Sequence, residues 1–348
     1  MKKIIFIGFK QLNREPRGVE SVIYSQISAI RNKYDRIYYI YYGLGVGKFD
    51  RIVNIGIGKN FFCATKKILS LTKKGFFNEC FIWSHNVALS IFLRNINILT
   101  VHDLFSRTNK ALFKAYIFKK IENLVFKKTI KIHCVSKFSS TVLSSFHPET
   151  SDKTSIIYNS SKFEITSPVN KKSSERIPII NKNYFLSVRS LESRANLYWL
   201  IDVFELYHKH AKDISLYIVG TGPLLKELSY YIEQKNLKNR IILTGYMPDY
   251  QLKELYKNAK LVIVSALSDE GFGLPVIEAY MFGIPVFVNN VDALPEIIYS
   301  KKYILSDDML KASTQLLRYQ NNGEDFEKYY HENFSKVKIE GQYKDLHG

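Results

Sequence analysis

Cysteine is scarce in this chain of 348 residues. Its three cysteines, Cys63, Cys80 and Cys134, are odd in number and lack the spacing of a metal site. This excludes a disulfide framework and is typical of a reducing cytoplasm. Long apolar runs are missing too. The run Ile4–Phe9 behind the basic tip of the chain is too short for a signal peptide or a membrane span, so we expect a buried strand there.

Acidic residues are scarce in the first 160 residues, which hold 9 of them against 26 Lys and Arg. The remainder holds 23 against 24, so nearly all of the net charge of +18 lies in the first half. Such a positive field attracts nucleic acid, acidic lipid or a phosphorylated substrate, and composition does not choose among them. The length predicts two domains, and a hydrophobic fraction of 46% is enough for two cores.

Short apolar runs alternate with helical patterns along the chain, which predicts an α/β fold with mostly parallel, doubly wound sheets. Strands are expected at 4–9, 36–42, 80–83, 96–101, 131–135, 184–188, 215–219, 241–244, 261–264 and 285–288. Helices are expected at 18–30, 111–126, 198–209, 224–234, 251–258 and 275–282.

The periodicity disappears between Ser161 and Asn183, where Pro, Ser and Lys dominate. We therefore expect a Rossmann-like N-terminal domain at 1–165, a linker at 166–183 and a second Rossmann-like domain at 184–325. A polar helix at 326–348 is expected to return to the first domain. Ligands of α/β sheets bind at the carboxyl ends of the strands, so we expect a central cleft between the domains to be shared by both.

The segment Ser268–Ala279 follows an apolar strand and opens a helix. Gly271 and Gly273 allow the backbone to approach a ligand, and free N–H groups at a helix start accept phosphate oxygens. Glu270 precedes the helix and Glu278 lies about one turn inside it, so the two carboxylates can reach opposite ends of an extended ligand. A glycine-rich turn with two solvated glutamates carries roughly equal weight on residue types alone.

This segment, Glu-Gly-Phe-Gly-Leu-Pro-x-x-Glu-Ala, resembles the E-x7-E signature of retaining GT-B glycosyltransferases of family GT4, or glycosyltransferase group 1. Other segments resemble that family in the same order, at 100–104, 135–139, 157–159, 218–223, 243–249 and 293–296. The resemblance implies the GT-B fold, in which two Rossmann-like domains face a central cleft.

The resemblance also implies roles for individual residues. Glu270 would hold hydroxyls of the transferred sugar, and His102 would touch that sugar near the reacting carbon from the other domain. Glu278 would bind the ribose, and the backbone around Met247 would face the base. The remaining donor contacts would come from the turn that holds Gly271, Phe272, Gly273 and Leu274.

The chain departs from the family pattern at two places. Of the usual glycine pair before the first helix, only Gly18 is kept. The basic pair that neutralises the diphosphate is also altered, because Ala195 stands where a lysine is expected. Fixed cations stabilise the charge that develops on a departing diphosphate, and Arg194 with Arg189 are the candidates for that task.

No Asp-x-Asp and no His/Cys cluster occurs, so we expect no metal and no other cofactor. Retention follows from the resemblance alone. The predicted function is transfer of a sugar from a nucleotide sugar to a saccharide acceptor in surface-polysaccharide assembly, such as O-antigen, lipopolysaccharide or capsule. A catalytically inactive subunit that binds a nucleotide sugar or a partner transferase is the alternative. A sugar-phosphate enzyme such as an epimerase is a weaker one.

A basic amphipathic pattern covers the predicted helix at 111–126. It interleaves lysines with apolar residues, and further lysines occur at 66–74. This pattern suits an anionic membrane surface, although a packing helix with a solvated lysine face is nearly as good an interpretation. We favour a polyprenyl-diphosphate-linked acceptor at the inner face of the cytoplasmic membrane. Nucleic acid is not expected as a partner, because no nucleic-acid-binding motif is visible. The patterned lysines are Lys110, Lys114, Lys119, Lys120, Lys127 and Lys128, and those at 66–74 are Lys66, Lys67, Lys73 and Lys74.

Overall fold

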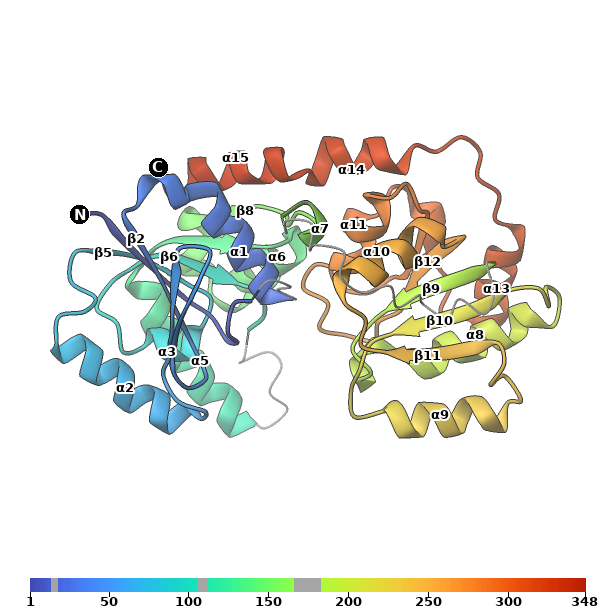
Figure 1. The fold of residues 1–348 in the computed structure, drawn as a ribbon, viewed down its shortest axis with the longest axis horizontal. Coiled ribbons are helices and arrows are strands. Elements are labelled where there is room, and N and C mark those ends of the chain that lie inside the picture. Colours follow the sequence, from blue (N-terminus) through green and yellow to red (C-terminus); the bar gives the residue numbers. More distant parts are fainter. Residues whose placement is uncertain (14–17, 105–111, 166–182) are drawn as a thin grey trace. The chain divides into compact units, whose positions relative to one another are not determined.

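The computed structural model describes residues 1–13, 18–104, 112–165 and 183–348. The chain forms two compact units: unit 1 holds residues 1–166 and 336–348, and unit 2 holds residues 167–335 (Figure 1). Each unit has its own sheet with helices on both faces, as the α/β pattern predicts. The predicted linker at 166–183 lies outside the described residues, except for its last residue.

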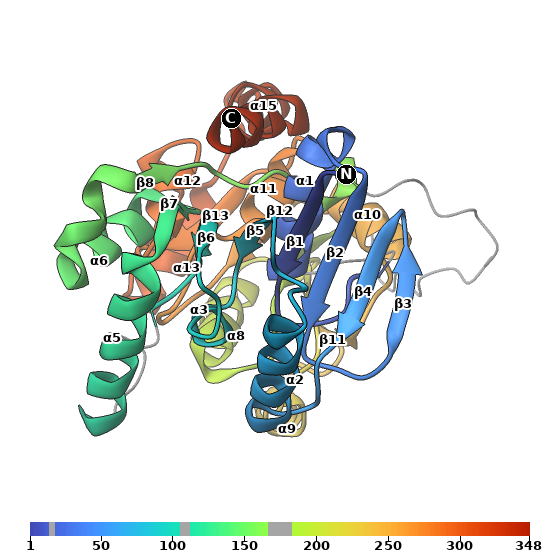
Figure 2. The ribbon, with the colours of Figure 1, turned by 90° about the vertical axis from the view of Figure 1, so that its left-hand side faces the viewer.

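Unit 1 is built on an eight-stranded sheet in which every neighbouring pair except β3–β4 is parallel. Figure 2 shows β3, β4, β2 and β1 side by side at one end of it. The chain runs outward from β1 in one direction and from β5 in the other, so the topological switch point lies between β1 and β5. In sheet order the strands are β3 (Val46–Phe49), β4 (Ile52–Gly56), β2 (Arg36–Tyr41), β1 (Lys3–Ile7), β5 (Cys80–Ser84), β6 (Ile96–Val101), β7 (Thr129–Cys134) and β8 (Thr154–Ile156).

Each face of this sheet has its own apolar core. One core joins the sheet to α1 and α15, and the other joins it to α2, α3, α5 and α6. The helices are α1 (Val19–Ile30), α2 (Phe61–Lys73), α3 (Val87–Ser90), α5 (Leu112–Lys127), α6 (Lys137–Phe146), α7 (Lys162–Ile165) and α15 (Lys336–His347).

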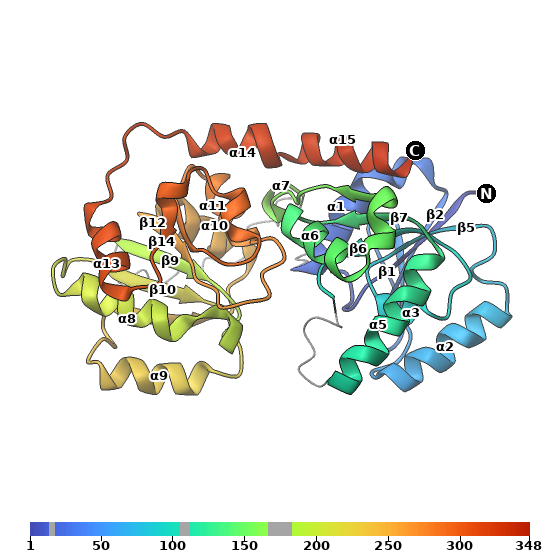
Figure 3. The same cartoon turned by 180° about the vertical axis from the view of Figure 1, so that it is seen from behind.

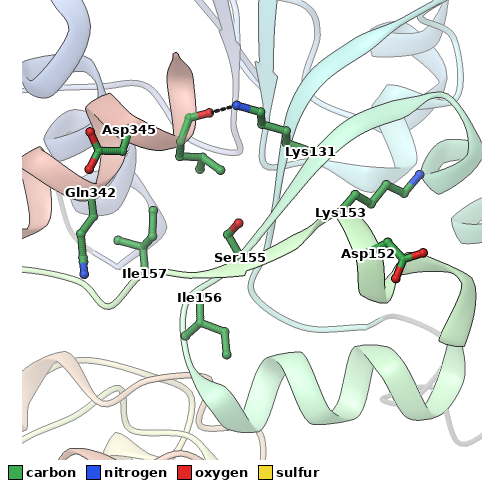
Figure 4. Close-up of a pocket in the computed structure, with 9 residues that line it drawn as sticks. Lys131, Asp152, Lys153, Ser155, Ile156, Ile157, Gln342 and Asp345 are labelled. Atoms are coloured by element: carbon green, nitrogen blue, oxygen red, sulfur yellow. Dashed lines mark hydrogen bonds between the residues drawn. The ribbon is translucent and has the colours of Figure 1, made fainter.

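The C-terminal helix α15 packs on α1 although the two are far apart in sequence. Tyr34 and His347 are joined by a 2.6 Å hydrogen bond, and the Lys131 ammonium donates to the carbonyl of Leu346 at 2.6 Å. A hollow of about 450 Å³ lies beside this contact, between β7, β8 and α15 (Figure 4). Its second lysine, Lys153, donates to the carbonyls of Phe126 and Thr129, so both ammonium groups serve to join elements.

A buried polar pair ties α5 to the end of α6. The Nε2 atom of His147 lies 3.0 Å from a carboxylate oxygen of Glu122, and both side chains are at most 1% exposed. The other ring nitrogen lies 2.7 Å from the amide oxygen of Asn123. Since buried polar groups are costly when they are left unpaired, this pair fixes how α5 lies against the sheet.

We expect Glu122→Ala to lower the free energy of unfolding of unit 1 by about 3 kcal/mol, because it removes the buried partner of the Nε2 atom of His147. Arg31→Ala is the control, since it breaks an exposed ion pair with Asp50 and should cost at most about 1 kcal/mol. Urea unfolding of the two variants tests this. Equal losses would show that the buried pair carries no special weight.

Unit 2 is built on a six-stranded sheet whose strand pairs are all parallel. Its order reverses between β9 and β12, so the switch point lies there. In sheet order the strands are β11 (Ile241–Gly245), β10 (Ser215–Val219), β9 (Tyr184–Val188), β12 (Leu261–Val264), β13 (Val286–Asn289) and β14 (Ile304–Leu305).

Helices α8, α9 and α13 cover one face of this sheet, and α10, α11 and α14 cover the other (Figure 3). Aromatic rings dominate the packing next to α11, where Tyr280 stacks on Phe326 with 5.5 Å between ring centroids. The helices are α8 (Leu197–His208), α9 (Leu225–Gln234), α10 (Asp249–Asn258), α11 (Leu274–Tyr280), α12 (Leu294–Ile297), α13 (Met309–Arg318) and α14 (Phe326–Phe334).

Two sequence predictions need correction. The expected single helix at 326–348 is two helices separated by Ser335, and only α15 belongs to unit 1, because Phe326 and Phe334 of α14 are buried in unit 2. The sequence pattern did not predict the strands β3, β4, β8 and β14 or the helices α2, α3, α6, α7, α12 and α13. Their apolar runs are short and interrupted by polar residues, so their hydrophobic periodicity is weak.

Candidate active site

The loop after β12 carries the predicted donor segment to the switch point of unit 2. Its neighbours brace it on both sides: the N–H of Ala266 donates to the side chain of buried Asn289, at the end of β13, at 3.1 Å. The N–H of Glu270 donates to the Asp292 carboxylate, also at 3.1 Å. These hydrogen bonds hold the backbone of the loop, and so the position of Glu270, independently of the Glu270 side chain.

Gly273 makes the turn into α11 possible. Its φ of +96° lies in the region that favours glycine, and a Cβ there would lie 2.7 Å from a methyl group of Leu294. The preceding side chain, Phe272, is buried, and its ring centroid lies 6.3 Å from that of Phe334 on α14. Phe272 therefore anchors the turn in the core, and only its backbone remains for a ligand.

Arg189 and Glu270 form an ion pair across the switch point. Arg189 directly follows β9, and its guanidinium donates to the Glu270 carboxylate at 2.5 Å. The two side chains are only 7% and 12% exposed. Among the described residues the Nε of Arg189 has no hydrogen-bond partner although it is buried. A cation and a carboxylate thus lie in contact, and the Nε–H of Arg189 can still donate a hydrogen bond.

Glu278 lies one turn inside α11 and is buried. It accepts a 2.9 Å hydrogen bond from the hydroxyl of Tyr256 on α10. Burial first, and then the charge of Glu278, raise the pKa of Tyr256 well above its ordinary value, so this hydroxyl remains a donor. Arg189 and Asp249 also act electrostatically on Tyr256, which places these side chains in one polar cluster.

Arg194 contacts the loop after β12 from a 3₁₀ turn at Ser193–Ala195. Its guanidinium donates to the carbonyl of Asp269 and to the Glu192 carboxylate, each at 3.1 Å, and it is about half exposed. The turn is clamped to the loop after β12, since the Ser265 hydroxyl donates to the carbonyl of Ala195 at 2.7 Å. The Ala195 side chain is buried, so it points away from solvent.

The backbones after β9 and β10 touch closely beside Arg189. A Cβ on Gly220 would lie 1.8 Å from the carbonyl oxygen of Arg189, and one on Gly222 would lie 2.4 Å from that of Leu191. Only glycine fits at both positions. The N–H of Gly220 also donates to Gly245 at 2.9 Å, which holds the loop with buried Met247 at the same carboxyl edge.

Unit 1 holds the other two predicted residues. His102 follows β6 and is partly buried, and its Nε2 lies 2.9 Å from the Nδ1 of His85, which follows β5. Burial is the main reason that the pKa of His102 is lowered to about 3 and that the pKa of His85 is lowered well below its ordinary value. Both imidazoles are therefore neutral at physiological pH. Gly18 precedes α1 with a φ of +56°.

Sequence reasoning missed several polar residues of these two groups. Tyr256, Asp249 and Asp292 surround the donor segment, and His85 and Gln26 support His102. Tyr256 lies at a core position of a helical pattern, which conceals its hydroxyl. His85 lies at a strand end like His102, and that shared position was the one available signal.

Within residues 1–13, 18–104, 112–165 and 183–348, no group of three or more His, Cys, Asp or Glu side chains is arranged so that it could hold a metal ion. Helices long and apolar enough to cross a membrane are likewise not found in this part of the chain.

Residues 170–333, which include the whole donor segment, match the family model of the glycosyl transferases group 1. This part of the chain belongs to the group 1 (GT4) glycosyltransferases. The segment Ser268–Ala279 lies within the matched residues and at the switch point of unit 2.

Curated relatives from bacteria match parts of the chain. O-antigen chain mannosyltransferase B of Escherichia coli is 30% identical over 36% of this chain and 34% of its own length. O-antigen chain mannosyltransferase RfbU of Salmonella typhimurium is 28% identical over 62% of this chain and 58% of its own. An E. coli UDP-Gal:α-D-GlcNAc-diphosphoundecaprenol α-1,3-galactosyltransferase is 25% identical over 56% and 51%. The chain thus spans about a third to three fifths of the length of these relatives.

Solved structures match 99% of the chain and show its fold. Sucrose-phosphate synthase of Thermosynechococcus elongatus superimposes with a TM-score of 0.79 at 15% identity, over 99% of this chain and 98% of that one. HepE of Anabaena, in complex with UDP and glucose, gives 0.75 at 16% identity over 99% of both chains. The chain has the GT-B fold, as predicted.

We expect Gly273→Ala to lower the free energy of unfolding of unit 2 by about 1–3 kcal/mol, through backbone strain and the contact with Leu294. Gly341→Ala is the matched control. Open space surrounds Gly341 on α15, so alanine there should be neutral or stabilising by up to about 1 kcal/mol. Chemical unfolding of both variants checks the pair, and a Gly273 variant as stable as the wild type would contradict the assigned role.

Proposed function

We propose that this chain transfers a sugar, with retention, from a nucleotide-sugar donor to a polyprenyl-diphosphate-linked saccharide in surface-polysaccharide assembly. The observation that carries the proposal is the Arg189–Glu270 pair beside Glu278 at the switch point of unit 2, within residues that match GT4. Names of relatives support the finer assignment, because they include O-antigen mannosyltransferases and an enzyme that acts on a diphosphoundecaprenol-linked sugar.

The reaction needs acceptors for the sugar hydroxyls and cations for the diphosphate. The bond between the sugar carbon C1 and the β-phosphate oxygen breaks, a bond from C1 to the acceptor oxygen forms, and the acceptor proton passes to the departing diphosphate. Glu270 accepts hydrogen bonds from sugar hydroxyls, and Arg189 and Arg194 stabilise the charge that grows on the diphosphate. Glu278 accepts from the ribose. His102 contacts the transferred sugar close to C1.

Two variants test the roles in the reaction. Glu270→Ala and His102→Ala should each lower kcat by about 10²–10⁴-fold, because each removes a contact to the sugar in the transition state. Lys209→Gln, a change of an exposed lysine of unit 2, is the control and should leave kcat unchanged. The assay supplies UDP-, GDP- and dTDP-sugars with a lipid-linked acceptor. Near-normal turnover in both site variants would overturn the assignment.

Metal independence is part of the proposal, since the arginines take the place that a divalent cation has in other transferases. Turnover should therefore survive an excess of EDTA. Loss of activity in EDTA that added Mg²⁺ or Mn²⁺ restores would contradict it.

The acceptor side of the proposal rests on two helices of unit 1. Helix N-termini lie at the carboxyl end of parallel strands, so α2 and α5 begin at the sheet edge that carries His102. Figures 1 to 3 show both helices extending from the same end of unit 1. Each exposes apolar side chains there: Phe61 and Phe62 on α2, and Phe113, Tyr116 and Ile117 on α5.

Lysines accompany these apolar side chains. The ammonium of Lys120 lies 4.6 Å from the ring centroid of Tyr116, and that of Lys66 lies 4.4 Å from the ring of Phe62. Exposed apolar rings beside cations are what an anionic lipid surface binds. One predicted member is wrong: Lys128 does not face outward, because its ammonium donates to the carbonyls of Ile91 and Leu93 at 2.6 Å each. Lys110 lies outside the described residues.

Replacing Lys119 and Lys120 by Gln should weaken binding to phosphatidylglycerol vesicles by roughly thirtyfold, since each lysine near an anionic surface contributes about 1 kcal/mol. The control replaces Lys209 and Lys212, which are exposed on unit 2, in the same way. Co-sedimentation at low and high salt measures both. Equal binding of the two double variants, or no binding by the wild type, would refute the membrane contact.

A second function has one observation in its favour. Ala195 stands at the position of the expected lysine, and its buried side chain supplies no cation. The chain would then bind a nucleotide sugar without transferring it. Donor binding without transfer or hydrolysis, with turnover only when a partner transferase is added, would favour this alternative.

A further inference from the structure

A chain of buried polar side chains runs behind His102 in unit 1. The Nε2 atom of His85 lies 2.7 Å from the amide oxygen of Gln26 on α1. The Gln26 amide nitrogen lies 3.4 Å from both the Thr100 hydroxyl and the Nδ1 of His133. His133 closes the chain, since its Nε2 lies 2.9 Å from the carbonyl oxygen of Ile157. The network joins α1 to the carboxyl ends of β5, β6 and β7.

At the His133 end of the network, the donor and the acceptor of each hydrogen bond can be assigned. A carbonyl oxygen only accepts, so His133 must donate from Nε2 to Ile157, and its Nδ1 must accept. Burial lowers the pKa of His133 to about 4, which keeps the ring neutral. Trp83 only donates, and its indole N–H reaches the Thr100 oxygen at 2.9 Å. The Thr100 proton is thereby left to the Nδ1 of His133, which lies 3.1 Å away.

The same assignment of donors and acceptors extends through Gln26 and His85 to His102. The acceptor capacity left on Thr100 takes the Gln26 NH₂ group, so the Gln26 carbonyl faces His85. His85 then donates from Nε2 and accepts at Nδ1. The proton shared by the two histidines must therefore sit on the Nε2 of His102. The lone pair of His102 is on Nδ1.

We propose that His85 and Gln26 are positioning residues that hold His102 as its Nε2–H tautomer and so present Nδ1 as a hydrogen-bond acceptor to a hydroxyl of the sugar. The catalytic consequence rests on the function proposed above. The tautomer itself does not, because it follows from the contacts within unit 1. The partners that orient a functional histidine commonly change activity by about 10–100-fold when they are removed.

Nuclear magnetic resonance of ¹⁵N-histidine-labelled protein tests the tautomer directly. Long-range ¹H–¹⁵N correlations distinguish a protonated ring nitrogen from one that carries a lone pair, and His102→Gln identifies the signals. We expect His102 with a proton on Nε2 and a lone pair on Nδ1, neutral from pH 8 down to about pH 5. A proton on Nδ1, or a mixture of both tautomers in the wild type, would overturn the proposal whatever the protein catalyses.

Two variants of His85 test the consequence. His85→Asn retains an oxygen near the place of Nδ1 and should keep the Nε2–H form of His102, with kcat within about tenfold of wild type. His85→Leu removes the acceptor and should lower kcat by about 10–100-fold with a much smaller change in KM for the donor. Ser90→Ala, which removes a nearby buried hydroxyl that bonds Ser84, is the control for disturbed packing.

The outcomes separate the two proposals. If His102 is fixed as Nε2–H but no nucleotide sugar is turned over, the proposed function fails and the tautomer assignment stands. If sugar is transferred while His85→Leu keeps wild-type kcat, the positioning role fails and the function stands. Equal loss of activity in His85→Leu and Ser90→Ala would also refute the positioning role.

Discussion

The ion pair between Arg189 and Glu270 is the contact on which the proposed donor site in unit 2 depends. It connects the residue that follows β9 with the loop that follows β12, at the point where the order of the sheet reverses. A carboxylate this little exposed is tolerated because a guanidinium faces it. The same pairing determines where Glu270 points, since the Asp292 contact fixes only its backbone. The proposed site for sugar hydroxyls and phosphate would therefore be preorganised before a ligand arrives.

Both units share one arrangement: a polar side chain that follows a strand is held by a polar side chain from a neighbouring segment of the fold. In unit 2 the groups are charged, as in the pair Arg189–Glu270. In unit 1 they are neutral, because burial lowers the pKa of each histidine near His102. The contrast fits the proposed chemistry: a departing diphosphate needs cations, whereas a neutral imidazole can accept a hydrogen bond from a sugar hydroxyl, which an imidazolium cannot.

Much of the fold was accessible from the sequence, and the reasons are local. Apolar runs such as Leu261–Val264 are buried on both faces, so their pattern predicts a parallel strand directly. The turn at Gly273 was likewise predictable, because its backbone conformation demands glycine. The partners of Glu278 and His102 were harder to find, since Tyr256 lies at a core position of another helix, and only its place at a strand end marks His85. Contacts between side chains of different helices and strands leave no periodic pattern in the sequence.

Hydrogen–deuterium exchange with and without nucleotide sugar measures the central claim most directly, which is that the loops after β9 and β12 hold the donor. Binding should slow exchange of the backbone amides at 189–196 and 268–280, because those N–H groups lose their access to solvent. The amides of α9, which carries no donor residue, should be unaffected. Protection confined to other segments, or none at saturating UDP-, GDP- and dTDP-sugars, would contradict the account.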